Sequence, residues 1–260
     1  MKHDILEIAD GFWNIRGSFK VGGLVDVGTH VSLVRRRRGG FVFLDSYTLD
    51  DDVERRARDL TNDGRDIEAI INVHPFHTVH VRHMHERFPS AKLYGTARHA
   101  SKLPELPWEP VRTEDPDVLE VFGEDFDFSV PRGVDFISRN ENVHFSSVLV
   151  LHRATRTIHV DDTLMYVRLP KLVRAFGYED ILRFHPTLSQ ALERRSGSSG
   201  DFRRWAEELA ERWRAAENLC AAHAAVLTAD RNRGPSIHAR ILHALESAER
   251  TLDSHERKYG

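Results

Sequence analysis

Short hydrophobic runs bounded by glycine or polar residues fill the first third of the chain and predict β-strands. GFWNIRG, THVSLVRR and GFVFLDS are rich in β-branched and aromatic residues, as strands are. The segment after Asp45 has apolar residues at helical spacing, and the apolar run DIEAIINV predicts a buried strand that ends near His74. A further helix is predicted up to Pro89, followed by a strand in AKLYG. This alternation of strands and helices predicts a layered α/β fold.

The second half begins with another β-rich block and ends with amphipathic helices. HFSSVLVLHRATRTIHVDD predicts a hairpin whose second strand ends in two aspartates, and we expect His152 and His159 to face solvent. The small polar residues 193–201 predict a mobile loop or linker. In the helix that follows, Trp205 and Trp213 lie on one stripe, which we expect to cover its own sheet, with a homodimer interface as the alternative.

Composition and charge exclude several classes of partner. A chain with 40% hydrophobic and 30% charged residues suits a soluble globular protein. The net charge of −3 gives no general attraction to nucleic acid or to a membrane surface, and no run approaches the ~18 apolar residues of a membrane span. The single cysteine, Cys220, cannot form a disulfide within the chain and is expected to be buried. We therefore expect a cytoplasmic protein that acts on a small-molecule substrate.

Histidines are concentrated in one short stretch. Five of the sixteen are close together in sequence: His74, His77, His80, His83 and His85. Pro75 disfavours a helical conformation at His74, so we expect His74 and His77 at the turn between strand and helix, where side chains can converge. His80 is a candidate catalytic group, whereas His83 and His85 are expected on a solvated helix face.

Further candidate ligands follow other predicted strands. His144 precedes the first strand of the hairpin, Asp162 follows its second strand, and His223 follows the apolar segment NLCAA. Active-site loops of α/β folds gather at such strand ends. Asp45 also ends a strand and is expected either to cap the turn or to hold neighbouring groups.

The order of these motifs resembles that of the metallo-β-lactamase superfamily. FVFLDS, IINVHPFHTVH, VHFSSVLVL, IHVDDTL and NLCAAHAAVLT stand where the family has its first aspartate, its histidine motif, a lone histidine, a bridging aspartate and a last histidine. The resemblance implies a four-layer αββα sandwich, built as one domain over residues 1–260 with two β–α halves, about 1–140 and 141–260. The metal ligands it implies are His74, His77, His144, Asp162 and His223. Asp45 and Asp161 would then support the site, and Asp162 and His80 are the candidate catalytic groups.

The histidine motif departs from that of the family. The family has H-x-H-x-D-H, whereas this chain has H-x-x-H-x-x-H from His74. Counted without gaps, Phe76 takes the second ligand position, Thr78 that of the aspartate and Val79 that of the last histidine. This departure argues against a complete site for a second metal ion, so we expect one or two ions.

Three histidines with an open coordination position are enough for a catalytic metal. His74, His77 and His144 could hold Zn²⁺ and lower the pKa of a bound water to roughly 7. Zinc is the expected ion, with iron and manganese as alternatives, because a histidine-rich and cysteine-poor set suits all three. The resemblance implies a metal-dependent hydrolase acting on an ester, lactone, thioester, amide or phosphoester. Two alternatives remain open: a non-catalytic binding protein on this fold, and a non-haem iron redox protein.

Overall fold

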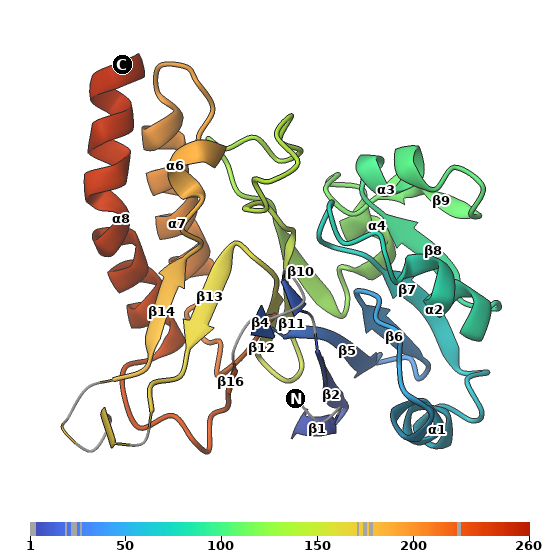
Figure 1. Ribbon diagram of the computed structural model, residues 1–260. Coiled ribbons are helices and arrows are strands. Elements are labelled where there is room, and N and C mark those ends of the chain that lie inside the picture. Colours follow the sequence, from blue (N-terminus) through green and yellow to red (C-terminus); the bar gives the residue numbers. More distant parts are fainter. Residues whose placement is uncertain are drawn as a thin grey trace. The chain divides into compact units, whose positions relative to one another are not determined.

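Two compact units make up the chain in the computed structural model (Figure 1). One comprises residues 1–128 and 152–155, and the other residues 129–151 and 156–260. The residues described are 4–18, 20–21, 25–26, 28–170, 172–173, 176, 179–222 and 225–260. Within these ranges no helix combines the length and the hydrophobicity that a membrane crossing needs.

A seven-stranded sheet forms the first unit. Its strands, in spatial order, are β1 (Asp4–Ala9), β2 (Phe12–Gly17), β5 (Thr29–Arg35), β6 (Phe41–Leu44), β7 (Ile67–Ile71), β8 (Lys92–Gly95) and β9 (Trp108–Arg112). Neighbours from β1 to β6 are antiparallel, and those from β6 to β9 are parallel. A separate ribbon pairs β3 (Lys20–Val21) with β4 (Val25–Asp26). Since parallel strands end at one edge, the residues that follow β6, β7, β8 and β9 gather there.

The described residues of this unit also form the helices α1 (Asp51–Leu60), α2 (Val81–Arg87), α3 (Ala97–Lys102) and α4 (Val118–Phe122). α1 begins at Asp50, whose side chain accepts a hydrogen bond from the Val53 amide at 2.9 Å. Val53 of α1 and Met84 of α2 are buried in one hydrophobic cluster with Ile70 of the sheet. The two helices therefore share one core with the strands that they connect, as the sequence pattern predicted.

The second unit combines a sheet with long helices. Four strands of its sheet are, in spatial order, β11 (Leu149–His152), β12 (Thr157–Val160), β15 (Asn218–Ala221) and β16 (Val226–Leu227). β13 (Leu164–Val167) and β14 (Ile181–Phe184) form a two-stranded ribbon, and the chain passes from the first unit to the second at β10 (Phe126–Ser129). The helices are α6 (Leu188–Ala191), α7 (Ser198–Arg212) and α8 (Ile237–Tyr259), with α7 beside α8 (Figure 1).

The tryptophan stripe of α7 is buried within its own unit. Trp205, Leu209 and Trp213 all belong to the hydrophobic core that also contains Ile241 and Leu245 of α8. This is the first of the two arrangements that the sequence allowed. Cys220, in β15, is fully buried, as expected.

The last residues of the segment predicted as a loop or linker, 198–201, instead begin α7, whereas residues 194–197 form bends and turns before the helix. Gly197 takes a left-handed conformation, with φ of 82°, and the helix begins at Ser198. Ser199 is buried, and its hydroxyl contacts the Leu252 carbonyl of α8 at 3.0 Å. The prediction of a mobile segment was wrong because these small residues allow close packing of two helices, which composition alone does not distinguish from a linker.

Several histidines are more buried than the sequence suggested. His152 and His159 are 2% and 0% exposed, so the prediction that they face solvent was wrong. For His159 the reason is that every residue of β12 is buried, so that neither face of the strand meets water. His152, the last residue of β11, packs against the rings of Phe12 and Phe126. His83 and His85, expected on a solvated face of α2, are each half-buried.

Candidate metal centre

The end of β7, where the histidine motif begins, is held by side chains from neighbouring segments. The carboxylate of Asp45 accepts a hydrogen bond from the Val73 amide at 2.9 Å. The Ser46 hydroxyl donates to the side-chain oxygen of Asn72 at 2.7 Å, and the Thr113 hydroxyl donates to the Asn72 carbonyl at 3.0 Å. All these side chains except that of Val73 are polar, and all five residues are buried. The backbone that leads into His74 is therefore fixed before the turn starts.

His74 and His77 come together in that turn. Their rings are stacked, with centroids 3.9 Å apart and planes inclined by 16°. His74 is fully buried and His77 half-buried. Nδ1 of His74 accepts the Phe76 amide proton at 3.1 Å, which in a neutral ring leaves the proton on Nε2. The prediction that Pro75 separates the strand from the helix, with both histidines between them, is confirmed.

His80 is placed directly before α2. Its Nδ1 lies 2.9 Å from the Thr48 hydroxyl, and its ring lies edge-on to Tyr47 with the centroids 5.0 Å apart. Burial, together with the charges of the neighbouring His77 and His83, lowers the pKa of His80 to about 4. The ring is therefore neutral at pH 7 and is a weak base.

His99 is a member of this cluster that the sequence analysis did not identify. It lies in α3, just after β8, and its Nδ1 accepts the Thr96 amide at 3.1 Å. Burial, together with the charges of neighbours that include His74 and His77, lowers the pKa of His99 to about 3. The signal was present as the sequence TARH, a threonine with a histidine three residues later, directly after a predicted strand.

In the second unit, a buried turn after β12 carries the two aspartates. Asp161 and Asp162 are 2% and 3% exposed. The Thr163 hydroxyl donates to the Phe145 carbonyl at 2.9 Å and accepts from the Ser147 amide at 2.9 Å. These two hydrogen bonds fix the turn to the segment that follows His144.

His144 itself is half-buried and contacts its own loop. Its Nε2 lies 2.6 Å from the Glu141 carbonyl, and because a carbonyl only accepts, Nε2 carries the proton. His223, the last expected ligand, lies outside the described residues.

Solved structures with this architecture are metallo-β-lactamases. DIM-1, crystallised after exposure to ceftazidime, shares 14% identity over 96% of this chain and 98% of its own, with a TM-score of 0.62. The chain has the metallo-β-lactamase fold. A metallo-β-lactamase from Erythrobacter litoralis, with β-mercaptoethanol in its active site, shares 12% identity over 96% of this chain and 97% of its own, with a TM-score of 0.62. FIM-1 from Pseudomonas aeruginosa, in its mono-zinc form, shares 11% identity over 95% and 96%, with a TM-score of 0.58.

The metallo-β-lactamase fold confirms the architecture that the order of the motifs implied. At 11 to 14% identity the likeness establishes the fold and nothing of the reaction. The sequence matches no protein-family model and no curated protein. The assignment of activity therefore depends on the residues of this chain.

Proposed function

We propose that this protein is a metal-dependent hydrolase in which His74 and His77 bind the metal ion, with Asp162 as the carboxylate ligand that the resemblance of the motifs implies. The observation that carries the proposal is the stacked pair of His74 and His77 at the end of β7, on a backbone that Asp45 holds. The fold supports it, since one solved structure with the same fold, FIM-1, was obtained in a mono-zinc form.

The residues fit a metal ion in their chemistry. Two imidazoles and one carboxylate, with a fourth position for water, are a donor set found in catalytic zinc sites. Iron and manganese accept the same donors, so zinc is the first expectation among three. The fit has one cost. A metal ion binds Nε2 of His74 only when that nitrogen carries no proton. The hydrogen bond from the Phe76 amide to Nδ1 instead favours the neutral tautomer with the proton on Nε2.

The surrounding residues position these donors. Asp45 fixes the backbone before His74, and Thr163 fixes the turn that carries Asp162. His80, neutral at pH 7, is available to accept a hydrogen bond or a proton beside His77. A divalent ion at this site would make hydroxide available near neutral pH and stabilise a developing oxyanion. The substrate class remains as the sequence suggested: an ester, lactone, thioester, amide or phosphoester.

Metal analysis of protein purified without added metal tests the proposal. We expect about one equivalent of zinc in the wild type, as in a site with a single catalytic ion. Asp162→Asn and His77→Gln should lose it. His243→Gln is the matched control, because His243 is exposed on α8, where its Nδ1 lies 3.3 Å from the Glu246 carboxylate. Hydrolysis of a panel of chromogenic esters, thioesters and phosphodiesters should disappear with chelation and return with zinc.

A second candidate is a non-catalytic binding protein. Its support is that nitrogens of both His74 and His144 are engaged in local hydrogen bonds with Phe76 and Glu141. If wild-type protein binds no metal even after loading with zinc, iron and manganese, the hydrolase proposal fails and this candidate replaces it. Stoichiometric iron with a visible absorption band would instead favour a redox protein.

A further inference from the structure

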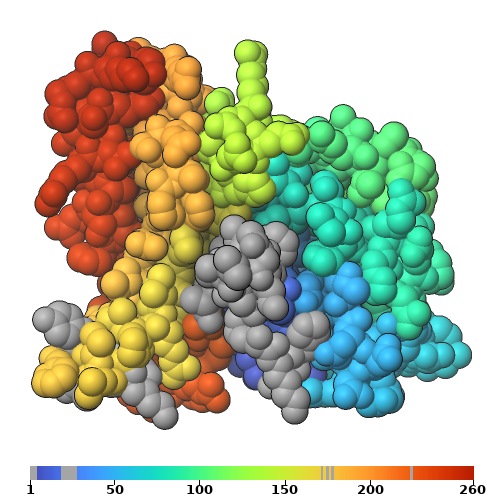
Figure 2. Space-filling view, in the orientation of Figure 1, coloured from blue at the N-terminus to red at the C-terminus, as the bar shows by residue number. Residues whose placement is uncertain are grey.

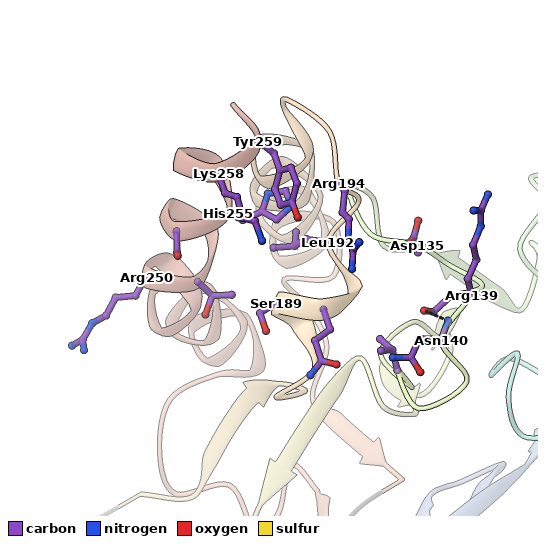
Figure 3. Close-up of a pocket in the computed structure, with 15 residues that line it drawn as sticks. Asp135, Arg139, Asn140, Ser189, Leu192, Arg194, Arg250, His255, Lys258 and Tyr259 are labelled. Carbon is purple, nitrogen blue, oxygen red and sulfur yellow. Dashed lines mark hydrogen bonds between the residues drawn. The ribbon is translucent and has the colours of Figure 1, made fainter.

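A cavity of about 850 Å³ opens in the second unit (Figure 3). Its walls are the last turns of α8, the region of α6 and the loop 135–143. Leu192 and His255 in its wall are buried, with exposed fractions of 2% and 8%. None of the described residues proposed to hold the metal lines this cavity. Its volume lies within the range of pockets that hold small-molecule ligands.

The charge around the cavity is strongly positive. Four cationic side chains line it, against a single carboxylate, that of Asp135: Arg139, Arg194, Arg250 and Lys258. Among the described residues, no carboxylate lies within ion-pair distance of any of these four side chains. Figure 3 shows Arg194 extending into the space between α8 and Asp135, whereas Arg250 extends away from the cavity.

Neighbouring arginines of the same region are paired, which sets the cavity apart. Arg203 on α7 binds three carboxylates of α8 at 2.7 to 2.9 Å: Glu249, Asp253 and Glu256. Arg195 binds Glu193 and Asp201 at 2.5 and 2.7 Å. Carboxylates are thus plentiful on these helices, but they pair with arginines that do not line the cavity. Within the described part of the chain, the cations that line the cavity form no such ion pairs, and Asp135 is the one carboxylate among the lining residues.

Neutral hydrogen-bonding groups complete the lining. Ser189, Gln190 and Asn140 offer hydroxyl and amide groups, and Tyr259 offers an aromatic face with a hydroxyl. A guanidinium with such neighbours suits phosphate and carboxylate groups, because its planar N–H donors match two oxygens at once.

We propose that this cavity binds a small molecule that carries two or more phosphate or carboxylate groups. Arg250 extends away from the cavity and is left out of the charge balance. One singly charged group would balance only part of the positive charge that Arg139, Arg194 and Lys258 carry in excess of Asp135, whereas a polyanion balances it. The ligand would lie across Arg194 and Lys258, with the polar side chains of the loop 135–143 against its other end. This site shares no residue with the proposed metal centre and is independent of hydrolysis.

Calorimetric titration with inorganic pyrophosphate and with citrate tests the proposal and separates the two chemistries. We expect saturable binding of one of them at low ionic strength, weakening as salt is added. The tighter of the two probes identifies phosphate or carboxylate as the group preferred. The double variant Arg194→Gln/Lys258→Gln should bind at least about tenfold more weakly, since it removes two charge-assisted contacts.

A charge-matched control separates a specific site from general attraction. Arg183 and Arg257 are exposed in the same unit and do not line the cavity, so Arg183→Gln/Arg257→Gln removes the same charge elsewhere. This control should lose less than about twofold in affinity. Asp162→Asn, expected to lose metal, should bind the probe as wild type does. An equal loss in the control, loss in Asp162→Asn, or no saturable binding of either probe would overturn the proposal.

Discussion

At the scale of single residues, Asp45 fixes the backbone that leads into the histidine motif. It lies directly after β6 with φ of 68°, in the left-handed region that side chains with a Cβ atom rarely adopt. It is 3% exposed, and its carboxylate accepts the Val73 amide at 2.9 Å. A short polar side chain tolerates this conformation best, so the residue provides both the turn and the hydrogen bond that precedes His74.

Substitutions at Asp45 should therefore separate the effect of its hydrogen bond and backbone conformation from the effect of its negative charge. Asp45→Ala removes the acceptor and leaves a Cβ in a strained conformation, so we expect a loss of about 2 to 3 kcal/mol in the free energy of unfolding. Asp45→Asn keeps a side-chain oxygen and tolerates positive φ, and should cost less than about 1 kcal/mol. Urea denaturation of both variants gives the two values. If Asp45→Asn is as unstable as Asp45→Ala, the negative charge and not the hydrogen bond is what the site requires.

The sequence predicted part of this neighbourhood and missed part of it. Pro75 and the apolar run before it were enough to place His74 and His77 in the turn after β7, because both signals act locally. The position of His99 beside that turn depends on the parallel pairing of β7 with β8, which brings α3 to the same edge. The sequence TARH marks the start of a helix, but no local pattern reports the strand pairing, so the position of His99 beside the turn appeared only in the structure.

At the scale of elements, a buried carboxylate joins α1 to the end of α2. Glu54 on α1 is 4% exposed and accepts hydrogen bonds from Arg58 at 2.7 Å and from Arg87 on α2, twice, at 2.7 Å. Burial alone would raise the pKa of Glu54, but hydrogen bonds from Arg87 and Arg58 lower it overall. The two helices that flank β7 are thus linked by charge as well as by their apolar faces.

Removing this carboxylate should loosen both helices. We expect Glu54→Ala to lower the free energy of unfolding by about 1 to 3 kcal/mol, as buried hydrogen bonds to charged groups do, the lower part of the range reflecting the half-exposed Arg87. Asp52→Ala is the control on the same helix, since the Asp52–Arg55 pair is exposed and should contribute at most about 1 kcal/mol. Chemical denaturation provides both values. Equal effects of the two substitutions would show that the link between the helices carries no particular stability.

Elements with periodic apolar patterns were predicted well, and those with ambiguous composition were not. The strands around the histidine motif and the helix bearing Trp205 and Trp213 follow their patterns closely. Residues 198–201 were misjudged because serine and glycine serve equally in a linker and at a close contact between helices. β12 was misjudged because burial of both its faces removes the alternation by which a strand's solvent side is recognised.

For the whole molecule, the order of motifs along the chain carried more information than any one of them. Each histidine or aspartate at a strand end was weak evidence on its own. Their order along the chain implied the metallo-β-lactamase fold, which solved structures confirm. What the order could not supply is the ligand set, since the H-x-x-H motif departs from the family's spacing. Several histidines are buried and neutral in the folded chain, and no sequence pattern predicted their burial.

These buried histidines should make the stability of the protein depend on pH in a defined window. The pKa of His80 is lowered to about 4, that of His99 to about 3 and that of His152 to about 4, in each case chiefly by burial. In the unfolded chain each would return to about 6.5, so the unfolded state binds more protons between these values. Stability contributed by the neutral rings is therefore complete above pH 6.5 and is lost as the pH falls toward 4. Carboxylates with lowered pKa values, such as Glu54, lose their contribution only at lower pH, below about 4.5.

His152 provides the cleanest test, because it is buried against Phe12 and Phe126, away from the histidine motif in sequence. Urea denaturation of metal-free protein between pH 7.5 and 5 should show stability falling as the pH decreases. His152→Gln cannot take up the proton, so its slope should be smaller by up to about 1.4 kcal/mol per pH unit, the value for one proton. His243→Gln, which changes an exposed ring on α8, should leave the slope as in the wild type. Parallel curves for His152→Gln and the wild type would mean that the His152 ring is not held neutral by burial.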